Sequence, residues 1–75
     1  MADTAQKDLI CVQVNGEPRS LPAGCTIASM LRAIGIDPTK VAVERNLEVV
    51  PRSTLDEVKV GDGDAFEIVH FVGGG

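Results

Sequence analysis

The stretch LICVQVNGEPRSL, residues 9–21, decides the fold. Its first part alternates between two faces, so residues 9–14 are predicted to form a half-buried strand with Ile10, Val12 and Val14 facing the core. Asn15-Gly16 follows, and this dipeptide is the strongest short hairpin signal because both turn residues adopt positive φ. Residues 17–21 are then predicted to form a second strand at a sheet edge, since Pro18 cannot donate a ladder hydrogen bond.

The middle of the chain is predicted to hold one short helix. Apolar side chains recur along one helical face, at Ile27, Met30, Leu31 and Ile34. Thr26 precedes them as a suitable N-cap, and Gly35 stands where the chain often adopts positive φ after a helix end. Since Pro38 cannot continue a helix, the predicted helix spans residues 27–34.

Two short strands and a helical turn follow the helix. The strands are predicted over residues 41–45 and 47–50, where apolar side chains again keep a strand-like phase. Residues 53–58 are predicted to hold one helical turn, capped by the hydroxyl of Ser53 or Thr54. The two strands are expected to extend the sheet that begins with the hairpin.

The final apolar segment completes an α+β layout. A Gly- and Asp-rich turn at residues 61–64 leads into a predicted last strand at residues 65–72. One helix covers only one face of a sheet, so we expect a two-layer domain with a mixed sheet of four to five strands. The first and last strands are predicted to be parallel neighbours in the middle of that sheet.

Length and charge limit the classes of function. The 75 residues fit one domain, predicted over residues 9–72, with a disordered polar lead-in at residues 1–8 and a flexible tail at residues 73–75. The lead-in lacks the apolar core of a signal peptide, and no apolar run reaches the roughly 20 residues that span a bilayer. We therefore expect a cytoplasmic protein without membrane contact. The net charge of −4 disfavours binding to nucleic acid, because phosphates would be repelled.

The two cysteines and the single histidine supply too few ligands for a zinc or iron–sulfur centre, so no metal is expected. Cys11 and Cys25 are expected to pack as small residues. His70 is expected to face solvent or a partner rather than to serve as a catalytic base. Asp62 and Asp64 are expected to form a turn rather than a calcium-binding loop. Arg45 and Arg52 are expected either to be solvated or to contact a partner's acidic groups.

The end of the sequence contains the candidate reactive group, the carboxylate of Gly75, and the residues that would surround it. A terminal carboxylate on Gly75 would be ionised, since its pKa is about 3.3–3.7, and it would be a poor electrophile until activated. Gly73 and Gly74 have no Cβ atoms, so this stretch could enter a narrow channel. Alternation in the last strand places Val69 and Phe71 on the face away from the helix. There they form a docking surface for partners or, alternatively, lie under a loop or residues 47–50.

Several of these segments carry a family resemblance. They are VNGE at residues 14–17, TI at 26–27, VAVERN at 41–46, VPR at 50–52, GD at 63–64 and EIVHFVGGG at 67–75. Together they resemble the ThiS family of sulfur carriers for thiazole biosynthesis. The last block is the most specific of them. The resemblance implies a ubiquitin-like β-grasp fold over nearly the whole predicted domain.

The resemblance also implies a mechanism. A ThiF-like, E1-like adenylyltransferase would use ATP and magnesium to adenylate the carboxylate of Gly75. Sulfur from a persulfide, supplied by a cysteine desulfurase or another donor, would then replace AMP. The resulting thiocarboxylate would deliver sulfur to a ThiG-like thiazole synthase. The chain would be a carrier with no bound cofactor, and a substrate of its partners rather than an enzyme.

Two alternatives to this function stay open from the residues alone. A molybdopterin-type sulfur carrier would share the terminal chemistry and differ in its acceptor, although residues 67–75 resemble the thiamine family more. A β-grasp interaction module would use only its surface. An enzyme is disfavoured, because no constellation of acid, base and nucleophile is evident in the sequence.

Overall fold

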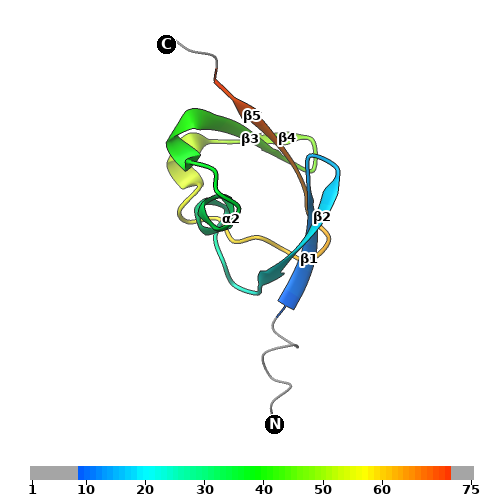
Figure 1. Cartoon of the computed structure of the whole chain (residues 1–75). Helices are drawn as coiled ribbons and strands as arrows, with labels where there is room; N and C mark the ends of the chain where they lie inside the picture. Colours follow the sequence, from blue (N-terminus) through cyan, green and yellow to red (C-terminus); the bar gives the residue numbers. More distant parts are fainter. Residues whose placement is uncertain (1–8, 72–75) are drawn as a thin grey trace.

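A computed structural model describes residues 9–71, which form a curved sheet wrapped around one helix (Figure 1). The strands are β1 Leu9–Val14, β2 Glu17–Pro22, β3 Val41–Arg45, β4 Glu48–Val50 and β5 Ala65–His70. They form a five-stranded sheet in the order β2-β1-β5-β3-β4. Strands β1 and β5 are parallel, and the other neighbours are antiparallel. The predicted mixed sheet with parallel first and last strands is therefore confirmed.

The first hairpin forms as predicted. Asn15 and Gly16 have φ values of 51° and 85°, and Val14 lies opposite Glu17 in the antiparallel register. Val12 and Val14 are buried, while Ile10 is partly buried at the margin of the core. The local turn signal and the alternation of β1 were therefore sufficient to place this hairpin.

Helix α2 spans Ile27–Ala33 and lies against the concave face of the sheet (Figure 1). The Thr26 side chain accepts a hydrogen bond from the Ser29 N–H, which confirms the predicted N-cap. The helix ends one residue earlier than predicted, because Ile34 leaves helical geometry at φ −98° and ψ 12°. Gly35 follows with φ +87°, the positive value expected after a helix end.

The predicted turn near residue 53 differs in its start and its cap. Residues 9–71 contain two 3₁₀ turns, η1 at Pro38–Lys40 and η2 at Arg52–Thr54. Neither Ser53 nor Thr54 caps η2. Pro51 occupies the cap position without a side-chain hydrogen bond, and the Thr54 hydroxyl donates back to the Pro51 carbonyl at 2.8 Å. The predicted cap was wrong because that hydroxyl satisfies a carbonyl rather than an N–H.

Two strand limits also differ from the sequence predictions. Strand β4 begins at Glu48, because Asn46 and Leu47 both have positive φ and form the turn after β3. Strand β5 ends at His70, and Phe71 follows it outside the strand. The predicted lead-in at residues 1–8, the end of the predicted last strand at Val72 and the tail at residues 73–75 lie outside the described residues.

The core lies between α2 and the concave face of the sheet. Its largest fully buried side chains come from the helix and from three strands: Phe66, Ile27, Met30, Leu31, Val12, Val41 and Val43. Val43, one of these residues, lies opposite Ile68 of β5 in the register, and Ile68 is also buried. Buried and exposed residues alternate over residues 41–44 of β3 and 65–68 of β5. The residues between them face away from the helix, and this leaves the convex face of the sheet open.

Candidate functional site

The convex face of the sheet carries exposed apolar residues near the end of β5. Val69 is 62 % exposed and Phe71 is 52 % exposed. Val69 lies opposite Ala42 of β3, and Val49 of β4, 71 % exposed, lies on the same face one strand further out. Residues 47–50 therefore extend this face beside β3 and do not cover it. The predicted exposure of Val69 and Phe71 is confirmed, and their role in docking stays a prediction.

Phe71 is the last described residue, and two contacts hold it. Its backbone N–H donates to the Lys40 carbonyl at 3.0 Å. The Arg52 guanidinium carbon lies 4.7 Å from the centre of the Phe71 ring. The ring lines a groove of about 160 Å³, which opens where β4 leaves β3 and includes Val41 and Leu55. These contacts fix the point at which the chain continues toward the predicted tail. Gly73, Gly74 and Gly75 themselves lie outside the described residues.

Two asparagines with positive φ hold β5 in place from either side. Asn15 receives the Ile68 N–H at 2.7 Å through its side-chain oxygen and donates its amide to the Ile68 carbonyl at 3.3 Å. Asn46 receives the Ala65 N–H at 3.0 Å through its side-chain oxygen. Both asparagines have φ 51°. The sequence identified Asn15 as a turn residue only, and it gave no sign that Asn15 and Asn46 also bind the strand that leads to the tail.

A buried carboxylate secures the turn that precedes β5. Asp64 accepts hydrogen bonds from Arg45 Nε at 2.9 Å, Asn46 Nδ2 at 3.1 Å and the Gly61 N–H at 2.8 Å. Burial by itself would raise the pKa of Asp64, but the hydrogen bonds from Gly61 and Asn46 and the charge of Arg45 lower this pKa below its ordinary value. Asp64 lies in the predicted turn, because its N–H donates to the Gly61 carbonyl at 3.1 Å. Arg45 pairs with a carboxylate of its own chain, so the prediction that it is solvated or contacts a partner was wrong.

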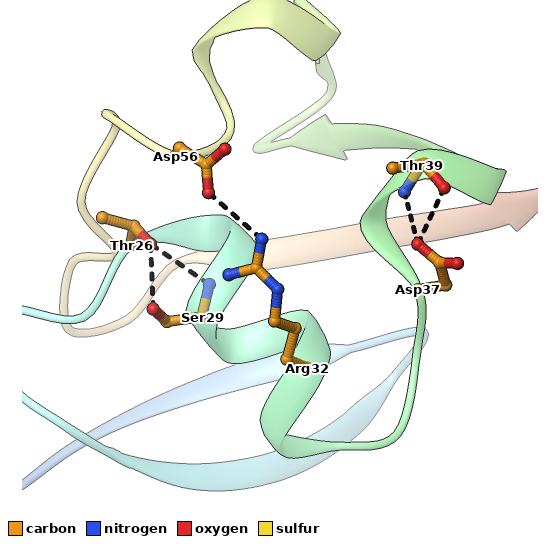
Figure 2. A network of polar contacts seen from close by, with 6 residues as sticks. All are labelled: Thr26, Ser29, Arg32, Asp37, Thr39 and Asp56. Atoms are coloured by element: carbon orange, nitrogen blue, oxygen red, sulfur yellow. Dashed lines mark hydrogen bonds and ion pairs between the residues drawn. The ribbon is translucent and has the colours of Figure 1, made fainter.

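The polar contacts around α2 have structural roles (Figure 2). Arg32 pairs with Asp56 at 3.4 Å between exposed side chains, and the Thr26 cap lies at the other end of the helix. Asp37 accepts from the N–H and the hydroxyl of Thr39, and the backbone hydrogen bond is the main cause of its lowered pKa. None of these residues lines the groove at Phe71.

The remaining candidate residues form no evident catalytic set. Cys11 is exposed, Cys25 is partly buried against the core, and neither is in a disulfide. His70 is exposed on β5 opposite Val41, as expected for a histidine that faces solvent or a partner. Within residues 9–71, no group of three or more histidine, cysteine or acidic side chains is placed to hold a metal ion. In the same part of the chain, no helix is long and apolar enough to cross a membrane.

Comparisons with known proteins give the same family from sequence and from structure. A thiazole synthase of Paramagnetospirillum magneticum is 53 % identical over 62 residues, which are 83 % of this chain and 19 % of that protein. The chain therefore spans about a fifth of the length of the thiazole synthases that it matches. The sulfur carrier protein ThiS of Bacillus subtilis is 44 % identical over 50 residues, 67 % of this chain and 76 % of that protein.

The fold comparison extends over most of the chain. The crystal structure of a thiamine biosynthesis protein, ThiS, from Geobacter metallireducens superposes with a TM-score of 0.72. It has 35 % sequence identity, and the match covers 88 % of this chain and all of that one. The predicted β-grasp fold is thereby confirmed. Because the ThiS family model also matches residues 12–75, the chain belongs to the ThiS family.

Proposed function

We propose that this chain is a sulfur carrier for the thiazole ring of thiamine and that the carboxylate of Gly75 is its working group. The observation that carries the proposal is the family match, which continues through residue 75 and so includes the glycines after β5. The sulfur carrier of Bacillus subtilis supports the carrier role. The thiazole synthases that contain a similar region support thiazole synthase as the acceptor of the sulfur.

The proposed chemistry begins with a carboxylate that must be activated. Its oxygen attacks the α-phosphorus of ATP on a ThiF-like adenylyltransferase, pyrophosphate leaves, and a mixed anhydride with AMP forms. Magnesium and cationic side chains of that enzyme would stabilise the charge that develops. The outer sulfur of a persulfide then attacks the acyl carbon and AMP leaves. A thiol reduces the resulting acyl disulfide, and the thiocarboxylate is released.

The described residues support this role by presenting the tail from a fixed strand. Asn15 and Asn46 hold β5 on both sides, and the contacts of Phe71 define where the chain leaves the sheet. A tail that starts from a fixed point has fewer arrangements to lose when it enters an active site, and this lowers the entropic cost of binding. Val69 and Phe71 would supply apolar contact area beside the entrance.

In this proposal the chain is a substrate of its partners and performs no turnover alone. A ThiF-like enzyme activates it, a cysteine desulfurase or another persulfide donor supplies the sulfur, and a ThiG-like thiazole synthase receives it. The cytoplasm is its expected compartment, because Cys11 and Cys25 are free thiols, as is usual in a reducing environment.

Intact mass spectrometry tests the proposal directly. The chain is incubated with a ThiF-like enzyme, ATP, magnesium and a persulfide donor, and we expect the mass increase of one oxygen replaced by sulfur. A matched chain with one alanine appended after Gly75 should keep its fold and stay unmodified. An interaction module would tolerate the added residue in every assay. Equal modification of both chains at internal residues would refute the role of Gly75.

A further inference from the structure

Two carboxylates face each other across the central strands of the open sheet face. Glu44 of β3 and Glu67 of β5 are partners in the antiparallel register, and both are exposed. Side chains in such positions have Cβ atoms roughly 4.5–5.5 Å apart, and two like charges placed there destabilise the sheet. We therefore expect the pair to cost stability.

None of the described strand residues on the same face carries a positive charge, so no strand neighbour offsets this pair. The other strand residues on the open face are apolar, small or uncharged: Leu9, Cys11, Gln13, Pro18, Ser20, Pro22, Ala42, Val49, Ala65 and Val69. Within residues 9–71, the recorded ion pairs join other acids to Arg19, Arg32 and Arg45. Lys40 precedes Glu44 by four residues, which is about 13 Å along an extended chain.

Apolar residues lie directly beside the two carboxylates. Val49 is the register partner of Glu44 on the outer side, and Val69 follows Glu67 along the same face of β5. Val49 is 71 % exposed and Val69 is 62 % exposed. We call these four residues and Ala42 the acidic patch. It combines two negative charges that have no ion-pair partner within residues 9–71 with exposed apolar side chains. Exposed apolar patches bordered by polar residues often mark interaction sites.

We infer that the acidic patch docks a thiazole synthase surface on which an arginine or lysine enters between Glu44 and Glu67 while an apolar side chain covers Val49 and Val69. The inference rests on the proposed function for the identity of the partner. Charge complementarity carries it, because a cation bound by both carboxylates removes their repulsion at the moment of binding. An arginine fits best, since its planar group can donate to two carboxylates together.

Other occupants of the patch are disfavoured by the same charges. A second copy packed face to face would bring four carboxylates together, and a nucleic acid or an anionic membrane would add phosphates to two unpaired acids. A basic protein surface is the remaining class of occupant, because it would make favourable contacts with both the negative charges and the apolar side chains of the patch. The relatives that carry a similar region within a thiazole synthase give that class a specific member.

Paired charge removal tests the inference. In Glu44→Gln/Glu67→Gln the shape is kept and two charges are lost, and we expect the Kd for thiazole synthase to rise about tenfold at low salt. The salt dependence of binding should also decrease, because fewer ionic contacts remain to be screened. The matched control is Glu48→Gln/Glu57→Gln, which changes net charge equally. Glu48 lies opposite Arg45, and Glu57 follows the η2 turn.

Stability provides a readout that separates docking from damage to the fold. Relief of the cross-strand repulsion should raise the thermal midpoint of Glu44→Gln/Glu67→Gln by about 2–4 °C, so weaker binding would accompany a more stable fold. Binding equal to that of the control double variant would overturn the inference. Loss of activation by the ThiF-like enzyme with unchanged synthase binding would also overturn it, because the patch would then serve a different partner.

The proposed function and the inference fail in distinguishable ways. If the wild-type chain acquires sulfur and Glu44→Gln/Glu67→Gln binds the synthase normally, the proposed function is supported and the proposed docking site is refuted. If the wild-type chain acquires no sulfur while synthase binding depends on Glu44 and Glu67, the carrier chemistry falls and the docking site is supported. If the wild-type chain neither acquires sulfur nor binds the synthase, both fall.

Discussion

Replacing Phe71 with alanine tests how firmly the exit of the tail is held. The ring is 52 % exposed, so truncation removes about half of the roughly 1.5–3 kcal/mol that full burial of a phenylalanine contributes. The contact with Arg52, 4.7 Å from ring centre to guanidinium carbon, adds about 0.5–1 kcal/mol at an exposed site. We therefore expect the free energy of unfolding to fall by about 2 kcal/mol in Phe71→Ala.

Urea unfolding followed by far-ultraviolet circular dichroism measures this loss, since the chain has no tryptophan or tyrosine to report by fluorescence. For a domain of this size, about 2 kcal/mol corresponds to a fall in thermal midpoint of about 8–16 °C. Phe71→Tyr keeps the ring over Arg52 and should retain most of the stability. Val69→Ala is the matched surface control, and it should change stability by less than about 0.5 kcal/mol because most of that side chain is already in water.

A double-mutant cycle isolates the contact between the ring and the arginine. Arg52→Gln and Phe71→Ala should couple by about 0.5–1 kcal/mol if the guanidinium lies over the ring in solution. The rate of thiocarboxylate formation should fall in Phe71→Ala beyond what the unfolded fraction explains, because the tail no longer starts from a fixed point. A stability loss below about 0.5 kcal/mol with no coupling to Arg52 would refute the anchoring of Phe71.

Three further predictions concern the residues that hold β5 and α2. Asp64→Asn should lower stability by about 2–3 kcal/mol at neutral pH, since a charged acceptor of three hydrogen bonds is lost. Because the folded pKa of Asp64 is lowered, its contribution is present above the unfolded value of about 3.9 and is lost as pH falls through the folded value. Urea unfolding at a series of pH values should show the wild-type and Asp64→Asn curves converging in acid, and a constant difference would contradict this. Asn15→Gly keeps the turn but removes two hydrogen bonds to Ile68, so we expect a loss of about 1–2 kcal/mol and faster exchange of the Ile68 amide. Thr26→Ala should cost about 1 kcal/mol in urea unfolding through the lost cap, whereas Thr26→Ser should restore it.

The sequence was sufficient for the features that depend on near neighbours. Asn15-Gly16 predicted the first turn, alternation predicted the buried residues of β1, and Thr26 predicted the start of α2. Each of these depends on residues within a few positions of one another, so a local pattern contains the necessary information. The end of α2 was misplaced by one residue, because the departure of Ile34 from helical dihedrals has no composition signal of its own.

The features that the sequence missed depend on residues far apart in the chain. Asn15 bonds to Ile68 across 53 positions, and Arg45 bonds to Asp64 across 19. A turn pattern identifies the asparagine and the aspartate but does not say where their side chains reach. The opposition of Glu44 and Glu67 likewise follows from the register of β3 and β5, and register is set by the assembled sheet.

Strand β5 connects these observations, because its two sides have different roles. The concave side packs in the core, and the convex side is exposed to solvent. Its concave side supplies Phe66 and Ile68 to the core, and its first residues are held by Asn46. Changes there should act through stability and affect every partner equally. Its convex side presents Glu67 and Val69, which take no part in the core. Changes there should alter binding to one partner while leaving the fold intact, and a change at Glu67 should make the fold more stable. Damage to the fold cannot produce weaker binding together with higher stability.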